Sequence, residues 1–154
     1  MQPDLWPFAE NLYQRPGVEA ACLHLQSRGA DVCLLLCAAW LQQRNLACTP
    51  ARVAQLRDCA HGWQKEVVGP LRALRQRWKM GALQDAELGV LRETVKRLEL
   101  DAERLQLQRL AACSQGWSDD QEGSSGAWIQ ALAPDDLTAA DQQALTDLNA
   151  AALS

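Results

Sequence analysis

The clearest pattern in the chain is an apolar repeat with alternating steps of three and four residues near its middle. The positions that carry it are Leu88, Leu91, Val95, Leu98, Ala102 and Leu105. This heptad spacing predicts one long helix, from about Asp85 to Ala112, whose stripe packs against another helix. The second helix could belong to the same chain or to a second copy, so a homodimer through residues 88–105 is one expectation. On either interpretation Leu98→Asp would bury an unpaired charge at a cost of several kcal/mol.

A second pattern predicts the centre of the fold. Residues from Val32 to Arg44 are apolar nearly all round, which indicates a helix enclosed by others, and Asp31 stands at its N-cap position. Two shorter amphipathic helices are expected before it, the first from about Asp4 to Gln14 and the second from Val18 to Ser27. Gly29 follows the second helix, where a left-handed cap is common.

A further helix is expected to start at Thr49-Pro50, with threonine as the cap and proline at the first helical position. Its apolar stripe continues from Arg52 to Lys79, and Gly69-Pro70 should kink or split it. Together these patterns predict an all-α protein, a compact bundle of about five helices over residues 3–113.

The C-terminal part has a different composition. Residues 114–127 are rich in Gly, Ser and Asp and predict a flexible linker, and residues 128–154 predict a flexible, acidic, amphipathic tail. Trp117 and Trp128 flank the linker, where no core is assured for a large aromatic side chain. They are therefore candidate anchors for a partner protein.

Charge is segregated along the chain. Residues 52–109 carry twelve basic and eight acidic side chains, whereas residues 110–154 carry seven acidic and no basic ones. Four cations without an acid fall in the segment from Leu71 to Lys79, namely Arg72, Arg75, Arg77 and Lys79. They predict contact with an acidic protein, an anionic membrane surface or nucleic-acid phosphates, and the acidic tail could cover them reversibly. A solvated basic face near a helix C-terminus is the alternative.

Net charge and the absence of known motifs exclude several classes of function. A net charge of −4 and the lack of any DNA- or RNA-binding signature make nucleic acid the weakest partner. The sequence contains no nucleotide-binding, metalloprotease or nucleophile-elbow motif, and its cysteines lack metal-ligand spacing, so neither catalytic residues, cofactor nor metal are expected. No signal peptide is recognisable, and the longest apolar run is half the length of a membrane span, which predicts a cytoplasmic protein.

Three ordered blocks carry a resemblance to a known family. They are Leu5–Ala9 followed by Tyr13–Val18, then Asp31–Leu36, then Trp63–Arg72. Together they resemble a family of small proteobacterial helical proteins that is defined as a domain of unknown function, over about residues 4–112. The resemblance implies a cytoplasmic helical protein and carries over no catalytic residue.

The function favoured by the sequence is a non-enzymatic cytoplasmic interaction or regulatory protein that binds a protein partner through its basic face, its acidic tail or both. The alternative is a small-ligand-binding or enzymatic helical bundle with an interhelical pocket near Trp40 and His24. A filled core would favour the first, and a large pocket with convergent polar groups the second.

Overall fold

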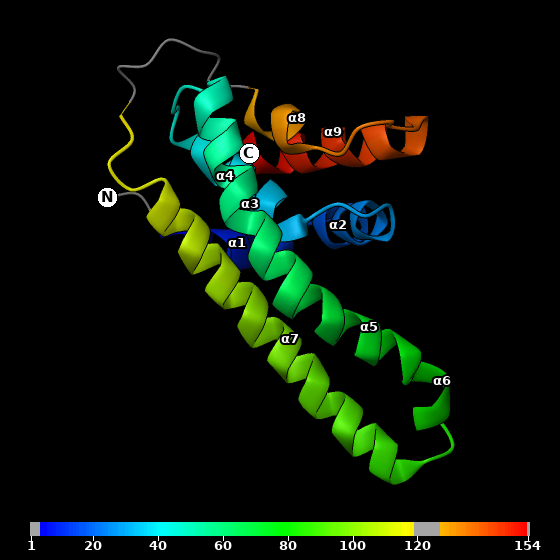
Figure 1. Ribbon diagram of the computed structural model, residues 1–154. Helices are drawn as coiled ribbons and strands as arrows, with labels where there is room; N and C mark the ends of the chain where they lie inside the picture. The colour runs from blue at the N-terminus through cyan, green and yellow to red at the C-terminus, as the bar shows by residue number, and fades with distance from the viewer. Residues whose placement is uncertain (1–3, 119–126, 154) are drawn as a thin grey trace.

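The computed structural model describes residues 4–118 and 127–153, and every regular element in these two ranges is helical. The all-α prediction is confirmed, but the helices are more numerous than the five expected (Figure 1). They are α1 (Leu5–Tyr13), α2 (Val18–Ser27), α3 (Val32–Gln43), α4 (Pro50–Trp63), the π-helix η1 (Gln64–Val68), α5 (Gly69–Arg77), α6 (Lys79–Ala82), α7 (Ala86–Cys113), α8 (Trp128–Leu132) and α9 (Ala139–Leu153).

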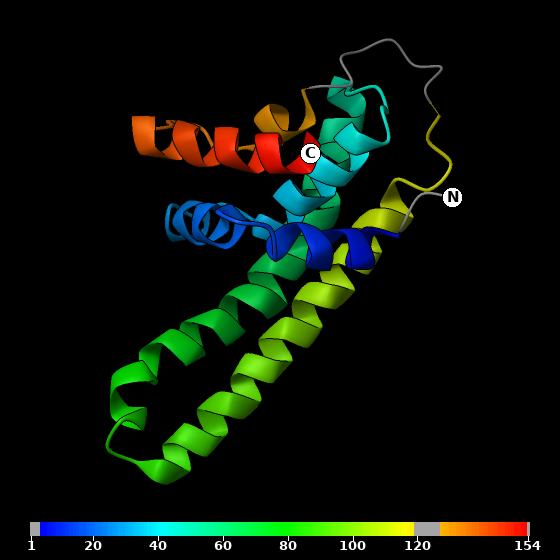
Figure 2. The same cartoon turned by 180° about the vertical axis from the view of Figure 1, so that it is seen from behind.

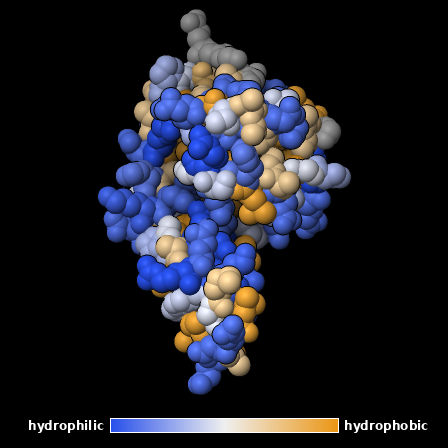
Figure 3. Space-filling view, turned by 90° about the vertical axis from the view of Figure 1, so that its right-hand side faces the viewer, coloured by the Kyte–Doolittle hydropathy of each residue, from blue (hydrophilic) through white to orange (hydrophobic). Residues whose placement is uncertain are grey.

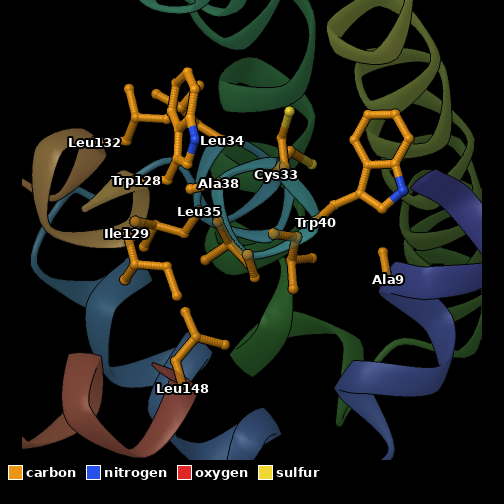
Figure 4. Close-up of a cluster of buried hydrophobic side chains, with 14 of the residues drawn as sticks. Ala9, Cys33, Leu34, Leu35, Ala38, Trp40, Trp128, Ile129, Leu132 and Leu148 are labelled. Atoms are coloured by element: carbon orange, nitrogen blue, oxygen red, sulfur yellow. The ribbon is translucent and has the colours of Figure 1, made fainter. Parts of the chain in front are cut away.

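Helix α3 is the centre of the fold, as its apolar pattern predicts. All of its residues from Val32 to Gln42 are buried. The side chain of Asp31 accepts a hydrogen bond from the Leu34 backbone N–H at 3.1 Å, which caps the helix. Figure 4 shows Trp128, Ile129 and Leu132 on one side of α3 and Ala9 near Trp40 on the other. The main core therefore consists of α3 and the helices that surround it.

Two parts of the molecule differ in shape. Helices α1–α4, α8 and α9 form a compact body, whereas α5, α6 and most of α7 project from it as a two-helix arm (Figures 1 and 2). We define the arm as residues 69–105. In it, α5 packs mainly against α7 and the adjoining η1, α6 packs against α7 and α5, and neither α5 nor α6 contains a buried residue. The arm is therefore held by a thin layer of contacts between two helices.

The predicted kink lies where α4 gives way to α5. Here a π-helix, Gln64–Val68, precedes Gly69 and Pro70. Proline lacks a backbone N–H and its ring clashes with the carbonyl four residues earlier, so a wider turn relieves the conflict. A Cβ at Gly69 would lie 2.9 Å from the Gln64 carbonyl oxygen, which explains why glycine occupies this position.

The heptad seam of α7 is only partly buried. Val95 and Ala102 face the interior as predicted, but Leu91, Leu98 and Leu105 are 56%, 50% and 45% exposed. Their places in the interface are taken by Glu99 and Gln106, which are both buried. The whole stripe therefore does not pack within the chain, because the packed face of α7 is rotated away from these leucines. The other alternative, a homodimer through residues 88–105, stays a prediction.

The C-terminal segment is part of the body. Helix α8 packs on α3 and α4, and α9 packs on α2 and α3, so the prediction of a flexible tail outside the bundle is wrong for residues 127–153. The prediction that this tail covers the basic residues is also wrong, since α9 lies against α2 and away from the arm (Figure 1). Most of the predicted linker, at residues 119–126, lies outside the described residues.

Candidate functional site

Two of the predicted partner-binding cations are engaged inside the arm. Arg72 donates from Nε to Glu99 Oε2 at 3.1 Å, and Arg75 donates from Nη2 to the same oxygen at 3.2 Å. The arginine side chains are 14% and 23% exposed. Arg72 and Arg75 thus point toward α7 and join the two helices of the arm. They do not form the solvated basic face that was the alternative prediction.

Glu99 is the acceptor that holds this cluster together. Its burial alone would raise the pKa, but the hydrogen bonds and charges of Arg75 and Arg72 outweigh burial and leave the pKa of Glu99 below its usual value. Arg92 adds a bond from Nε to the Arg75 carbonyl at 2.9 Å. Charged side chains of α5 and α7 therefore join the two helices of the arm.

The other two predicted cations lie at the end of the arm. Arg77 and Lys79 are exposed, and next to them along the chain Met80 and Leu83 are 75% and 77% exposed. Val90, on the far side of the turn, is 68% exposed. Figure 3 shows hydrophobic side chains gathered on this narrow end of the molecule. The tip thus combines basic and apolar side chains.

The exposed leucines of α7 extend this surface along the arm. Leu91, Leu98 and Leu105 recur every seven residues, so they lie near one line along the helix. Fourteen residues of helix span about 21 Å. We call these three side chains the leucine stripe.

Trp117 and Trp128, the predicted partner anchors, contact each other. Their rings stack with centroids 5.9 Å apart. Trp128 is fully buried and donates its indole N–H to the Leu46 carbonyl at 2.7 Å, and the guanidinium of Arg52 lies 5.0 Å from the Trp117 ring centroid. The prediction that Trp128 is an exposed anchor is wrong, because α3 and α4 leave an apolar space that its ring fills.

A cavity of about 690 Å³ lies between α1, α2, α3 and α7, with Arg75 of α5 at its edge. Its apolar wall includes Trp6, Leu36 and Leu107. Its polar residues include Tyr13 and Glu103. Pockets of this size, with apolar walls and a few polar groups, are typical of small-molecule sites.

Glu103 has an unusual environment for a carboxylate. The closest cation is Arg72, whose Nη2 is 3.8 Å from Glu103 Oε1 and whose Nε is already committed to Glu99. Burial raises the pKa of Glu103 to about 7. Burial also raises the pKa of Tyr13 to about 12, so the phenol is neutral at physiological pH.

A pocket was expected near Trp40 and His24, and Trp40 does line a smaller one of about 470 Å³, together with Arg44 and Ala111. His24 lines neither this pocket nor the larger cavity. His24 instead lies beside α9, with Nε2 2.7 Å from Asp141 Oδ1, while Arg28 donates from Nε to Asp141 Oδ2 at 3.1 Å. Asp141 is buried and also accepts the Thr138 backbone N–H at 2.9 Å. This cluster holds α9 against α2.

The cysteines show no metal site within the described residues, where no group of three or more His, Cys, Asp or Glu side chains could hold an ion. Cys22, Cys33 and Cys37 are buried, and burial raises the pKa of each thiol. Across the same residues, no helix combines the length and apolar character needed to cross a bilayer.

Sequence reasoning missed the residues that build the cavity and the arm interface, above all Glu99, Glu103 and Tyr13. For Glu99 and Glu103 the sequence did contain a usable pattern. Arg72 and Arg75 are spaced i,i+3 and Glu99 and Glu103 are spaced i,i+4, so two helices paired across the arm would bring opposite charges together. Tyr13 had no such signal.

The chain belongs to the family described as "Protein of unknown function (DUF2390)", whose model matches residues 4–110. The expected resemblance to a domain of unknown function is therefore confirmed. The match includes α1–α6 and nearly all of α7, so both the arm and the cavity lie within the family domain. No curated protein and no solved structure matches the chain.

Proposed function

We propose that this protein is a cytoplasmic, non-enzymatic interaction protein that binds an amphipathic helix of a partner protein along its arm. The observation that carries the proposal is the leucine stripe of α7, which stands exposed on a projecting element. Several large apolar side chains exposed in a row on one element can mark an interaction site. The stripe has the seven-residue spacing by which one helix recognises another.

The length of the stripe favours a helix over a membrane. A bilayer that touched the tip would reach Met80 and Leu83, but Leu105 lies about 21 Å farther along the helix than Leu91. A partner helix laid along the arm can contact all three leucines at once.

Charge indicates the chemistry of that helix. The arm, residues 69–105, carries eight basic and six acidic side chains, although the whole chain has a net charge of −4. Arg77 and Lys79 are exposed near the apolar tip. A partner helix with acidic residues beside its apolar stripe would complement this surface, and would be steered to it at low ionic strength.

The test is site-specific photo-crosslinking in cells with benzoylphenylalanine at position 94 or position 146. Thr94 lies three residues after Leu91 and four before Leu98, on the same side of α7. Thr146 is a matched control on α9, because both threonines are exposed and each hydroxyl donates to the carbonyl four residues earlier.

We expect position 94, and not position 146, to crosslink to one segment of another protein, and that segment to be acidic and amphipathic. Crosslinks to α7 of a second copy would replace the proposal with a homodimer. Flotation with anionic vesicles and no protein crosslink would replace it with membrane contact. Equal crosslinking from positions 94 and 146 would also overturn it.

A further inference from the structure

The cavity between α1 and α7 is separate from the leucine stripe. On the α7 helix, its lining residues Leu100, Glu103 and Leu107 are spaced by three and four and share one face. The leucines at 91, 98 and 105 do not line it. A ligand in the cavity would therefore leave the arm surface free.

Charged side chains of both signs surround the cavity. The acidic side chains that line it are Glu10, Glu93, Glu99 and Glu103, and the basic ones are Arg75, Lys96 and Arg97. Asp31 and Arg72 lie close to Glu103, and the guanidinium of Arg104 lies 5.0 Å from the ring centroid of Trp6 on the cavity wall.

Glu103 is paired less closely than the neighbouring glutamates. Glu99 binds both Arg72 and Arg75, and Lys96 Nζ lies 3.4 Å from Glu93 Oε1. The ion pair of Glu103 is longer, with Arg72 Nη2 3.8 Å from its Oε1. The charge of Arg75 also lowers the pKa of Glu103, whereas the charges of Glu99 and Asp31 raise it, and Tyr13 of α1 presents a neutral hydroxyl.

We propose that the cavity binds a small amine with an apolar body. The ammonium group donates hydrogen bonds to the Glu103 carboxylate, and the apolar body packs against Trp6, Leu36 and Leu107. A ligand carboxylate would meet Glu103 and Glu10 instead, and a neutral ligand would bring Glu103 no opposite charge beyond that of Arg72.

The protonation of Glu103 supports this assignment. Because burial raises the pKa of Glu103 to about 7, the empty site holds a proton on this group for much of the time near neutral pH. A bound ammonium group supplies the positive charge in place of that proton. Amine binding should therefore release a proton and weaken as the pH falls from 8 to 6.

The test is calorimetric titration of the full-length protein at pH 7.5 with three probes of equal length: n-octylamine, 1-octanol and octanoate. The amine is protonated at this pH. We expect n-octylamine to bind about tenfold or more tightly than 1-octanol, and octanoate to bind weakest, because a charged hydrogen bond distinguishes the amine. Equal affinity for the three would overturn the proposal.

Glu103→Gln should reduce n-octylamine affinity about tenfold to a hundredfold and leave 1-octanol affinity unchanged. Glu10→Gln is the matched control, because it removes the same charge from an exposed residue at the edge of the cavity. If the two variants weaken amine binding equally, the amine senses only the net charge and the assignment to Glu103 is wrong.

A third variant tests the location without touching Glu103. Leu100 lines the cavity and is 54% exposed, so Leu100→Trp can add bulk there with little cost to folding. It should weaken n-octylamine and 1-octanol together. Unchanged binding of both would place the probes elsewhere and overturn the proposal, whether or not Glu103→Gln folds.

Discussion

Replacing Trp128 with alanine tests whether the C-terminal segment is part of the folded body. The indole ring is fully buried against α3, stacks on Trp117 and donates to the Leu46 carbonyl. Removing a buried tryptophan from a core costs about 3–5 kcal/mol. That is a large fraction of the about 5–15 kcal/mol by which domains are stable.

The assay is urea unfolding followed by far-UV circular dichroism, with a thermal melt beside it. A loss of about 3–5 kcal/mol corresponds to a melting temperature lower by roughly 6–20 °C for a protein of this size. Leu153→Ala is the control, because that leucine is 68% exposed on α9 and should change stability by no more than about 0.5 kcal/mol. If Trp128→Ala lowered the free energy of unfolding by less than about 1 kcal/mol, the reasoning would be refuted. Residues 127–153 would then not be part of the folded body.

Three further predictions follow from particular side chains. Leu98→Asp should lower the free energy of unfolding of the isolated protein by about 1 kcal/mol in urea, since the side chain is half exposed; a loss of several kcal/mol would show that the leucine stripe is covered. Asp141→Asn should destabilise the protein at pH 7. The bonds from Thr138, Arg28 and His24 lower the Asp141 pKa despite its burial, so the difference from wild type should persist above pH 4 and shrink in melts at lower pH. Because burial raises the Glu103 pKa from 4.5 to about 7, wild-type stability should fall as pH rises through that interval, and Glu103→Gln should reduce the fall; parallel pH profiles of the two proteins would contradict this.

Local chemistry explains what could be predicted from the sequence. Asp31 and Thr49 cap their helices as expected, because a cap needs only a short polar side chain and the backbone N–H three residues later. Asp85 caps α7 in the same way. The apolar run of α3 likewise predicted its central position without reference to any other element.

The features that could not be predicted from the sequence depend on contacts between residues far apart in the chain. A buried Trp128 requires the carbonyl of Leu46, which lies 82 residues away, so composition alone indicated an exposed tail. The seven-residue spacing of leucines is the same whether a partner helix belongs to this chain or to another. Glu99 could be placed in an interface only once Arg72 and Arg75 were known to face it across the arm.

The central claim is that the leucine stripe binds a partner helix. Its most direct test is the affinity of the segment that crosslinks to position 94, made as a synthetic peptide and titrated by fluorescence anisotropy against wild type, Leu98→Asp and Leu153→Asp. Both substitutions place the same charge on an exposed leucine, the first on the arm and the second on α9. The account predicts at least a tenfold loss of affinity for Leu98→Asp and none for Leu153→Asp, whereas equal affinity for all three proteins would contradict it.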